Sequence, residues 1–526
     1  NTTEDTDGGR ESTVTFKGLQ SGGEESTLAE IRASHDATAD DQKGDLIFKT
    51  NDGSDNNAPT ERLRIDSDGS IVPATLGTSN VKLGLNAGKA IASGGNYNTV
   101  IGEEAGAALS TGDVNTFVGY QSGDATTTSG NNVGVGYGSL TTNILSSKNV
   151  AIGNNALKTH NLGSAGDGLN VAVGHGAGES VTTGQYNTFI GGTAGDANTD
   201  GDQNTGVGYD ALGSNISAAQ NTAVGYGALA SNTSGGPNTA VGRGSLNSNT
   251  TGSENVAVGI NALNANTTAA QNTAVGAYSL DACTTGTRNV AMGRTALTAC
   301  TTGYDNTFIG EKAGEVLTTG YNNTAIGQYA MSAGQTMIHN TAVGHLAGFT
   351  VTGDYNTFLG QAAGYNNLTS GDNNTLLGYY AQSSSATVSN EFTLGNASVS
   401  SLRCADTSIS SLSDERDKKN IVDVPLGLDF IKTLRPVSFD WNARDGSRVG
   451  KKDFGFVAQE LKTAQDATDY ADHMRLVGTG ELTLDSGKVE MLEADPMKTY
   501  PVLVKAVQEL STALDAALAR IATLEG

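Results

Sequence analysis

The chain repeats one short phrase, Asn-Thr-Ala-Val-Gly, and this repetition constrains its fold more than any other feature. In the looser form Asn-x-x-x-Gly the phrase recurs at steps of 17 residues with few lapses, the largest being the step of 21 after Asn149. A fixed period held for about 300 residues is typical of a solenoid, in which each repeat forms one turn and contacts only its neighbours. The phrase begins at Asn80, Asn98, Asn115, Asn132, Asn149, Asn170, Asn187, Asn204, Asn221, Asn238, Asn255, Asn272, Asn289, Asn306, Asn323, Asn340, Asn356 and Asn374.

A single repeat has the pattern of a strand, a bend and a return loop. Residues 255–258 predict a strand, Gly259 allows a tight bend, and residues 261–263 predict a second short strand before the polar return loop. A recurrent glycine supplies a positive φ or a close backbone approach that other residues resist. A recurrent asparagine can form a ladder, in which each side-chain amide bonds to the amide one turn above and below.

Two positions of the repeat vary together. The first position lies two residues before the repeat glycine, and the second lies four residues after it. Where the first position is Phe, the second tends to be Gly. Where the first position is Ala, the second tends to be Leu. Large opposite small keeps the volume of a packed layer constant, so we expect the two columns to touch across the roll. The pairs are Phe117 with Gly123, Phe189 with Gly195, Phe308 with Gly314, Phe358 with Gly364, Ala151 with Leu157, Ala223 with Leu229, Ala240 with Leu246, Ala257 with Leu263 and Ala291 with Leu297. Ala172 with Gly178 and Ala342 with Gly348 are exceptions.

Two cysteines and ten tyrosines also follow the repeat. Cys283 and Cys300 lie one repeat apart, a spacing that a disulfide could accept. Alternatively each is a small buried replacement in the asparagine column of Asn215, Asn232, Asn249 and Asn266. The tyrosines could stack on sugars, or could simply cover the outside of the roll. They are Tyr120, Tyr137, Tyr209, Tyr226 and Tyr379 after the repeat glycine, and Tyr97, Tyr186, Tyr304, Tyr321 and Tyr355 just before the repeat asparagine.

Charge and composition exclude several classes of partner. A net charge of -24 argues against nucleic acid and against anionic membrane surfaces. The sequence has no run of about 18 apolar residues and no signal peptide, so we expect no membrane insertion. Because the first residue is Asn, we expect an N-terminal part to have been removed or left out. Asp196, Asp200 and Asp202 could hold Ca²⁺, but no regular calcium-loop motif surrounds them, so we expect no metal and no cofactor.

The N-terminal 79 residues predict a small β domain. Residues 13–16, 46–49 and 62–65 alternate in the manner of half-buried strands and are separated by turn-rich stretches. Such strands are too few for a sandwich, so we expect partner chains to close the core. Residues 61–69 resemble a segment common in phage tail-fibre proteins, where it precedes a fibre shaft. The Asn-Thr-Ala-Val-Gly repeat itself resembles the left-handed parallel β-roll of YadA-type trimeric adhesin heads, with a longer repeat and hence a longer outer loop.

The composition changes near Ser400, where charge rises and the 17-residue period stops. The segments 413–421, 434–441 and 454–461 together resemble the intramolecular chaperone of phage tailspikes and fibres, the peptidase S74 family. Its opening motif, Ser-Asp-x-Arg-x-Lys-x-Asn-Ile, is matched by Ser413, Asp414, Arg416, Lys418, Asn420 and Ile421.

This resemblance implies self-cleavage between Leu412 and Ser413. It assigns Ser413 as the nucleophile and Lys418 as the general base, with Asp414, Arg416 and Asn420 as supporting residues. A serine hydroxyl is weak until a base takes its proton, and a lysine can do so only where desolvation or cationic neighbours lower its pKa. Without the family resemblance, a Ser and a Lys five residues apart would be read as an ordinary polar surface pair.

The chain ends in a predicted helix with a heptad seam. A helix packed into a core would give the same pattern. In the chaperone family this helix closes a trimer, which would fix the register of three repetitive chains before the solenoid assembles. Cleavage afterwards would make assembly kinetically irreversible. The seam consists of Leu503, Val507, Leu510, Leu514, Ala517, Ile521 and Leu524.

The sequence therefore predicts a mainly β chain with a small β domain in residues 1–79, a β-roll solenoid in 80–400, a linker in 401–412 and an α+β chaperone domain in 413–526 that ends in a trimeric coiled-coil helix. We expect a homotrimeric viral tail fibre or spike, assembled in the host cytoplasm and located in the virion. It would bind a host receptor, expected to be a glycan, and other tail proteins at its N-terminal end. Autoproteolysis is the only predicted activity. The alternatives are a tailspike depolymerase acting on host polysaccharide and a bacterial YadA-like trimeric adhesin.

Overall fold

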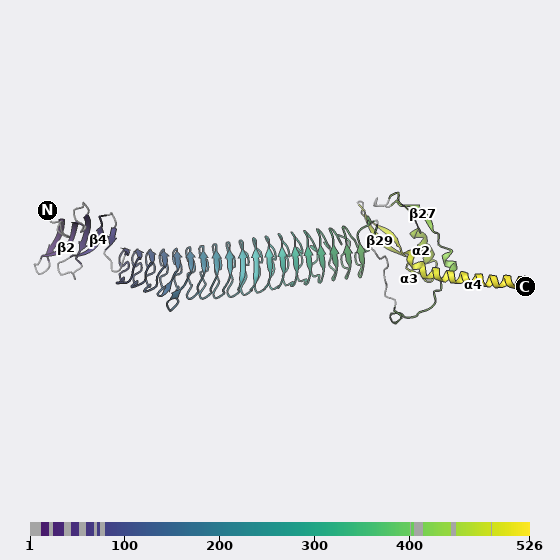
Figure 1. The fold of residues 1–526 in the computed structure, drawn as a ribbon, viewed down its shortest axis with the longest axis horizontal. Helices are drawn as coiled ribbons and strands as arrows, with labels where there is room; N and C mark the ends of the chain where they lie inside the picture. The colour runs from purple at the N-terminus through teal and green to yellow at the C-terminus, as the bar shows by residue number, and fades with distance from the viewer. Residues whose placement is uncertain are drawn as a thin grey trace. The chain divides into compact units, whose positions relative to one another are not determined.

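The structure is a computed structural model of the 526-residue chain. It describes residues 12–19, 25–35, 44–51, 59–67, 71–73, 79–399, 401–403, 414–442, 449–484 and 487–526. The chain divides into two compact units, Asn1–Asn322 and Asn323–Gly526. The fold is mainly β, with short parallel strands that recur once per repeat in both units (Figure 1). Within the described ranges, helices occur only after the last repeat.

The first unit begins with a five-stranded antiparallel sheet. Its strands are β1 (Ser12–Leu19), β2 (Glu25–His35), β3 (Gly44–Thr50), β4 (Thr60–Ile65) and β5 (Ile71–Pro73), in that order across the sheet. The strands predicted at residues 13–16, 46–49 and 62–65 are confirmed as parts of β1, β3 and β4. Sequence reasoning missed β2, in which Glu30 and Arg32 interrupt the apolar pattern and pair with each other at 3.2 Å.

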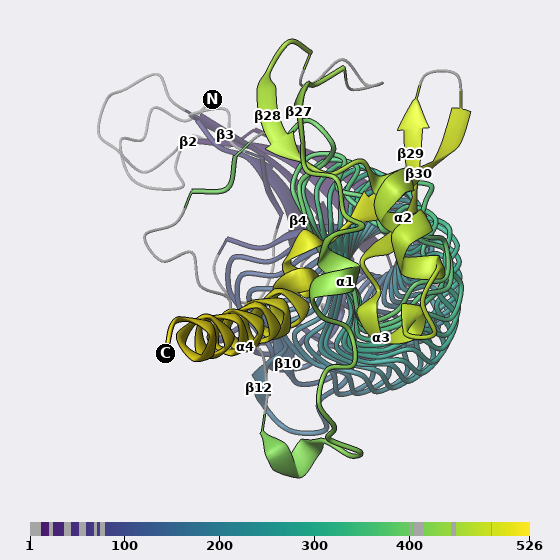
Figure 2. The ribbon, with the colours of Figure 1, turned by 90° about the vertical axis from the view of Figure 1, so that its right-hand side faces the viewer.

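The solenoid of the first unit is built mainly from strands of three or four residues, and the strands of consecutive turns pair in parallel. Seen end-on, its turns lie one behind another (Figure 2). The longer repeat after Asn149 adds β12 (Gly166–Asp167), which pairs in parallel with β10 (Ser146–Ser147) of the repeat before it. The other strands are β6 (Val81–Leu83), β7 (Thr99–Ile101), β8 (Thr116–Val118), β9 (Val133–Val135), β11 (Val150–Ile152), β13 (Val171–Val173), β14 (Thr188–Ile190), β15 (Thr205–Val207), β16 (Thr222–Val224), β17 (Asn238–Val241), β18 (Asn255–Val258), β19 (Thr273–Val275), β20 (Val290–Met292) and β21 (Thr307–Ile309).

The second unit begins with further turns of the same kind and ends with the C-terminal module. Its solenoid strands are also parallel: β22 (Thr324–Ile326), β23 (Thr341–Val343), β24 (Thr357–Leu359), β25 (Thr375–Leu377) and β26 (Phe392–Leu394). The module contains η1 (Glu415–Asp417), α1 (Leu428–Ile431), β27 (Val437–Asp440), β28 (Lys452–Gly455), α2 (Ala458–Asp466), α3 (Ala471–Met474), β29 (Val477–Leu484), β30 (Gly487–Ala494), η2 (Pro496–Thr499) and α4 (Tyr500–Glu525). Among the described residues, none of the helices is both long and apolar enough to cross a membrane.

The predicted second strand of each repeat is wrong. Residues 261–263 form a turn, in which Asn261 and Leu263 have φ values of 54° and 52°. A left-handed residue cannot continue a strand, and the position recurs with the same geometry, as in Leu229 at 52°. The left-handed turn directs the leucine into the interior, where its side chain is fully buried.

The predicted contact between the two covarying columns is confirmed. A Cβ placed on Gly314 would lie 2.5 Å from the ring of Phe308, so the phenylalanine occupies the space that a leucine fills in other repeats. Gly178, one of the exceptions, is small because side chains from the neighbouring turns fill the space beside it. A Cβ placed on Gly178 would lie 3.0 Å from the side chain of Leu157 and 3.2 Å from that of Phe189. Volume is therefore matched within a turn and also between neighbouring turns.

The repeat glycine is required for two reasons. Gly225 has a φ of 139°, a conformation that side chains rarely adopt, and a Cβ there would lie 2.6 Å from the backbone carbonyl carbon of Gly242 in the next turn. These two turns can therefore stack at this distance only if Gly225 lacks a side chain.

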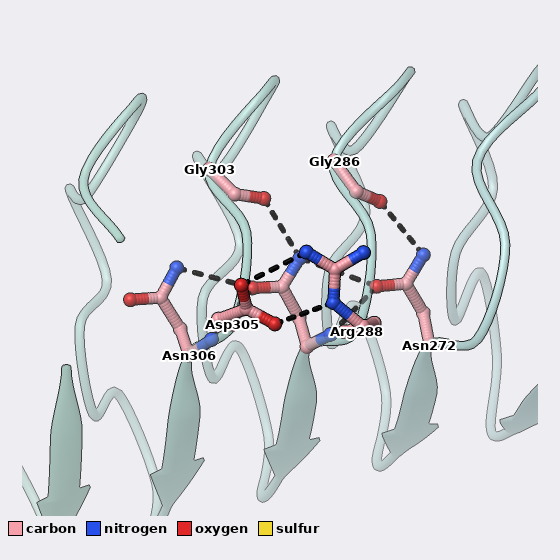
Figure 3. A network of polar contacts seen from close by, with 7 residues as sticks. Asn272, Gly286, Arg288, Gly303, Asp305 and Asn306 are labelled. Atoms are coloured by element: carbon pink, nitrogen blue, oxygen red, sulfur yellow. Dashed lines mark hydrogen bonds and ion pairs between the residues drawn. The ribbon is translucent and has the colours of Figure 1, made fainter. Parts of the chain in front are cut away.

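The asparagine ladder is confirmed, although most of its bonds go to the backbone. The Oδ1 of Asn238 accepts from the backbone N–H of Asn255 at 3.0 Å, and its Nδ2 donates to the carbonyl of Gly252 at 2.9 Å. Amide-to-amide bonds also occur, as between Asn255 Nδ2 and Asn238 Oδ1 at 3.1 Å. Figure 3 shows the same pattern at Asn272, beside an exposed ion pair that links adjacent turns through Arg288 and Asp305.

The two cysteines continue a second asparagine column as free thiols, so the disulfide alternative is wrong. Asn249 Nδ2 donates to Asn232 Oδ1 at 2.8 Å and Asn266 Nδ2 donates to Asn249 Oδ1 at 2.7 Å. Cys283 instead donates to the carbonyl of Gly286 at 3.4 Å, and the buried Oδ1 of Asn266 has no partner among the described residues. Burial raises the pKa of Cys283 to about 12 and that of Cys300 to about 11.

Candidate functional site: the C-terminal module

The residues that follow the predicted cleavage point form an exposed loop. Asp414 caps η1 by accepting from the backbone N–H of Arg416 at 2.9 Å, and it holds the guanidinium of the same residue at 2.6 Å. This bond from Arg416 lowers the pKa of the Asp414 carboxyl. Because Arg416 is committed to Asp414, it is a weaker cationic neighbour for the predicted base than the sequence suggested.

The predicted base and its neighbours are exposed to solvent. Lys418 follows η1 and its backbone N–H donates to the carbonyl of Glu415 at 3.1 Å, while its side chain is exposed. Asn420 is also exposed and has a φ of 54°. The other two predicted site residues, Leu412 and Ser413, lie outside the described residues. The structure therefore brings Asp414, Arg416, Lys418 and Asn420 into one loop, and the prediction for Ser413 stays a prediction.

The two later motifs pack against each other. Arg435, at the end of the segment after α1, forms an ion pair with Glu460 of α2, with Nε and Oε2 3.0 Å apart. Trp441 donates from Nε1 to Asp453 at 3.3 Å, and its ring meets that of Phe439 edge to face at 5.2 Å. Segments 434–441 and 454–461, separated in the sequence by residues 442–453, thus form one structural group.

A small apolar core joins these motifs to the last helix. Four side chains are buried together: Phe430 of α1, Met474 of α3, Val502 of α4, and Leu476 between α3 and β29. The Glu509 carboxylate of α4 accepts from the backbone N–H of Leu428 at 2.8 Å, at the start of α1. Sequence reasoning missed Gln465, whose Oε1 accepts from the backbone N–H groups of Leu476 and Val477, because a glutamine inside a helix carries no signal of burial.

Comparison with known families agrees with this geometry. Residues 413–472 match the family model described as the chaperone of endosialidase, Peptidase_S74. The chain carries a chaperone-of-endosialidase domain. No curated protein and no solved structure matches the chain. The resemblance inferred from the three segments is thereby confirmed, and the match covers η1 through the start of α3.

The last helix of the chain leaves its heptad seam exposed. The predicted helix is confirmed as α4, which buries only Val502 and Ala506 in the module. Every residue of the predicted seam from Leu503 to Leu524 is exposed, including Val507 and Leu514 at 58%. Within one chain α4 is therefore not a core-packed helix beyond its first two turns.

The strands of the solenoid present a second uncharged surface. In most strands the central residue faces inward and its neighbours face outward, as in Thr222, Ala223 and Val224, where only Ala223 is buried. The outer side chain before the repeat glycine is Val, Ile, Leu or Met in every described strand from β6 to β26 except β10 and β12, which precede no repeat glycine. These side chains are partly exposed, as Ile190 is at 40% and Met292 at 40%. A continuous aliphatic face follows the strands within each unit.

The predicted tyrosine columns lie on the outside of the roll. Nine of the ten tyrosines are exposed, and Tyr321 is half-buried. Many of them stack on the tyrosine of the next turn, as Tyr209 does on Tyr226 with ring centroids 5.6 Å apart and planes at 16°. Among the residues that the structure describes, no group of three or more His, Cys, Asp or Glu side chains could hold a metal ion.

Proposed function

We propose that the chain is a homotrimeric viral tail fibre or spike that attaches the virion to its host, and that its C-terminal module is an intramolecular chaperone. The observation that carries this proposal is a chaperone-of-endosialidase domain followed by a helix whose heptad seam is unburied. Attachment to a host receptor, contact with other tail proteins at the N-terminal end and assembly in the host cytoplasm belong to the same proposal.

The exposed seam of α4 supports self-association. Leu, Val, Ile and Ala recur at alternating steps of four and three, so the side chains form one stripe along the helix. A stripe of this length left in water forfeits roughly 1.5–3 kcal/mol for each large side chain that a partner could bury. Three copies of α4 can satisfy one another, because the same stripe faces the common axis in each chain.

The aliphatic face of the solenoid supports the same parallel assembly. In identical chains packed side by side in register, each column lies near its own copy, so a charged column would face its own charge. The strand face carries Thr, Val, Ile, Leu, Met and, in β26, Phe at its outer positions and avoids the repulsion.

Self-cleavage would follow assembly. The Ser413 hydroxyl attacks the carbonyl of Leu412 while Lys418 takes the hydroxyl proton and returns it to the departing Ser413 amine. Water then hydrolyses the resulting ester, leaving a Leu412 carboxylate and a free Ser413. A lysine serves as a base where water is excluded, and the Lys418 side chain is exposed in the single chain. Neighbouring copies would supply that exclusion, so cleavage depends on assembly.

The test compares the wild type with Ser413→Ala and Lys418→Ala on a denaturing gel. The wild type should release a fragment that starts at Ser413, identified by N-terminal sequencing, and both variants should stay full length. Ser411→Ala is the matched control and should cleave normally. Light scattering should give three chains for the uncleaved variants. A wild type that assembles but remains full length contradicts the self-cleavage, and a monomer contradicts the trimer.

The two alternatives make different demands. A tailspike depolymerase would shorten host polysaccharide chains, which size-exclusion chromatography of the polysaccharide would reveal. A bacterial YadA-like adhesin would share the roll, but the chaperone-of-endosialidase match gives it no support.

A further inference from the structure

We propose that five aromatic residues on the turns of β22 to β25 form a binding site for a neutral saccharide of the host surface. The cluster consists of Tyr329, Phe349, Tyr365, Tyr379 and Tyr380, and it is called the aromatic cluster below. This inference rests on the proposed attachment function and assigns the receptor chemistry to particular residues. The cluster lies in the second unit, and only Tyr379 belongs to the tyrosine columns predicted from the sequence.

The five rings form a chain of contacts across four consecutive turns. Tyr329 and Phe349 lie 6.4 Å apart between ring centroids, Phe349 and Tyr365 5.6 Å, Tyr365 and Tyr380 6.4 Å, and Tyr380 and Tyr379 5.9 Å. Tyr379 is exposed and the other four are half-buried. The chain of rings therefore forms a continuous aromatic surface rather than a set of separate side chains.

Ring orientation distinguishes the aromatic cluster from the stacked pairs elsewhere. In Tyr120 with Tyr137 and in Tyr304 with Tyr321 the planes are at 18° and 4°, so each ring covers a face of its partner. In the aromatic cluster the planes are tilted by 46° to 69°. Tilted rings leave faces uncovered, and the electron-rich face of an aromatic ring attracts the weakly positive C–H groups of a pyranose.

The solenoid does not need aromatic residues at these positions. Phe349 and Tyr365 are each five residues after their repeat glycine, where other repeats have Ala230, Asn247 or Thr298. Those repeats form the same strand and turn. The aromatic side chains therefore add a surface that the fold itself does not require.

Amide side chains lie on the turns that carry the aromatic cluster, and His345 follows the repeat glycine of the turn between two of them. Gln328 and Gln361 follow the repeat glycines of two of these turns and are exposed. Gln382 donates from Nε2 to the carbonyl of Ala362 at 3.1 Å, and its Oε1 has no partner among the described residues. Amides bond hydroxyl groups as donors and as acceptors, whereas an acidic sugar would call for Arg or Lys. These groups favour a neutral saccharide.

The test measures retardation of the uncleaved trimer in native gels that contain one polysaccharide each. Dextran, mannan and galactan are the neutral probes, and alginate is the acidic probe. At least one neutral probe should retard the Ser413→Ala protein. Phe349→Ala with Tyr365→Ala should weaken that binding tenfold or more. Tyr209→Ala with Tyr226→Ala, which removes a stacked pair, is the matched control and should stay within twofold. Tyr365→Phe keeps a ring face and should also bind.

Each other outcome overturns the inference or the function beneath it. Equal binding by the Phe349→Ala, Tyr365→Ala protein, with an unchanged melting temperature, overturns the site. Retardation by alginate alone overturns the neutral class. Fluorescently labelled protein is also applied to a panel of bacterial strains. Labelled cells without retardation by any neutral probe overturn the saccharide site and leave attachment standing. A protein that labels no strain and is retarded by no probe overturns both the saccharide site and the proposed attachment function.

Discussion

At the scale of single residues, the interior of the solenoid is governed by the left-handed position four residues after the repeat glycine. Leu229 and Gly314 share this backbone geometry, with φ values of 52° and 61°. A leucine held there has a strain of about 1–2 kcal/mol, which its complete burial offsets. Whether this position is Leu or Gly depends on the size of the side chain that the preceding strand places in the same space.

This choice can be tested by exchanging one pair. Gly314→Leu should destabilise the protein by about 1–3 kcal/mol or more, because the new side chain meets the ring of Phe308. The double variant Phe308→Ala with Gly314→Leu recreates the pair found at Ala291 and Leu297 and should recover most of the loss. Chemical denaturation measures both. If the double variant is as unstable as the single one, the two columns do not share one volume.

His160 gives the solenoid a predictable dependence on pH. It is fully buried, bonds Ser146 through Nε2 at 2.9 Å, and has its pKa lowered to about 4 by desolvation. The unfolded chain, with an ordinary value near 6.5, binds the proton first as the pH falls. Stability should therefore be full above about pH 6.5 and decrease by roughly 3 kcal/mol towards pH 4.

The control for this prediction is His160→Asn, because Asn143 and Asn198 occupy the same position of their repeats. Denaturation midpoints of the two proteins, compared between pH 7 and pH 4, should diverge as the pH falls. Parallel curves would show that the buried imidazole does not titrate as described.

The buried thiols should resist modification. Their pKa values are raised by burial, so Cys283 and Cys300 are almost entirely protonated at neutral pH. In a Cys404→Ser protein, iodoacetamide should label neither cysteine in the folded state and both after unfolding, as measured by mass spectrometry. A mass two units lower, with no labelling after unfolding, would indicate the disulfide instead.

At the scale of elements, α4 and the solenoid strands differ in what covers their apolar side chains. Each solenoid strand is covered by the turns before and after it, whereas α4 is covered within its own chain only at Val502 and Ala506. The rest of its apolar stripe has no cover in the described part of the chain. A substitution on that stripe should therefore affect assembly and leave the single chain folded.

Leu514→Glu should abolish the trimer, because it would place three carboxylates at the helix interface, and should prevent cleavage with it. Thr512→Glu adds the same charge to an exposed position off the seam and should leave both unchanged. Light scattering and the denaturing gel report the two effects. A Leu514→Glu protein that still forms trimers would mean that α4 is not the trimerising element.

At the scale of the whole molecule, the number of turns in the solenoid can change without changing how the columns of neighbouring turns align. Deleting residues 238–254 removes one complete turn and brings Asn221 into contact with Asn255, which preserves every column. We expect this deletion to change the melting temperature by only a few degrees and to leave trimer formation and cleavage intact. Deleting residues 238–245 breaks the columns and should prevent folding. Equal loss of structure in both, measured by circular dichroism, would contradict an additive solenoid.

Several features of the fold were determined by the sequence alone. The 17-residue period requires a solenoid because each turn can bury its apolar residues only against neighbouring turns. The pairing of Phe with Gly and of Ala with Leu requires two columns in contact because packed volume is fixed. The heptad in residues 503–524 requires an amphipathic helix. These are local or periodic constraints, and a sequence displays them directly.

Other features were decided only by the tertiary structure. The predicted strand at 261–263 is a left-handed turn, since burial of Leu263 in the neighbouring turns outweighs its backbone preference. The aromatic cluster joins residues from three different positions of the repeat, which no single column reveals. The single chain leaves Lys418 and the α4 seam in solvent. Each of these features depends on which side chains meet across turns or chains. The burial of a residue is set by the residues packed around it in the folded structure, and its own identity does not determine it.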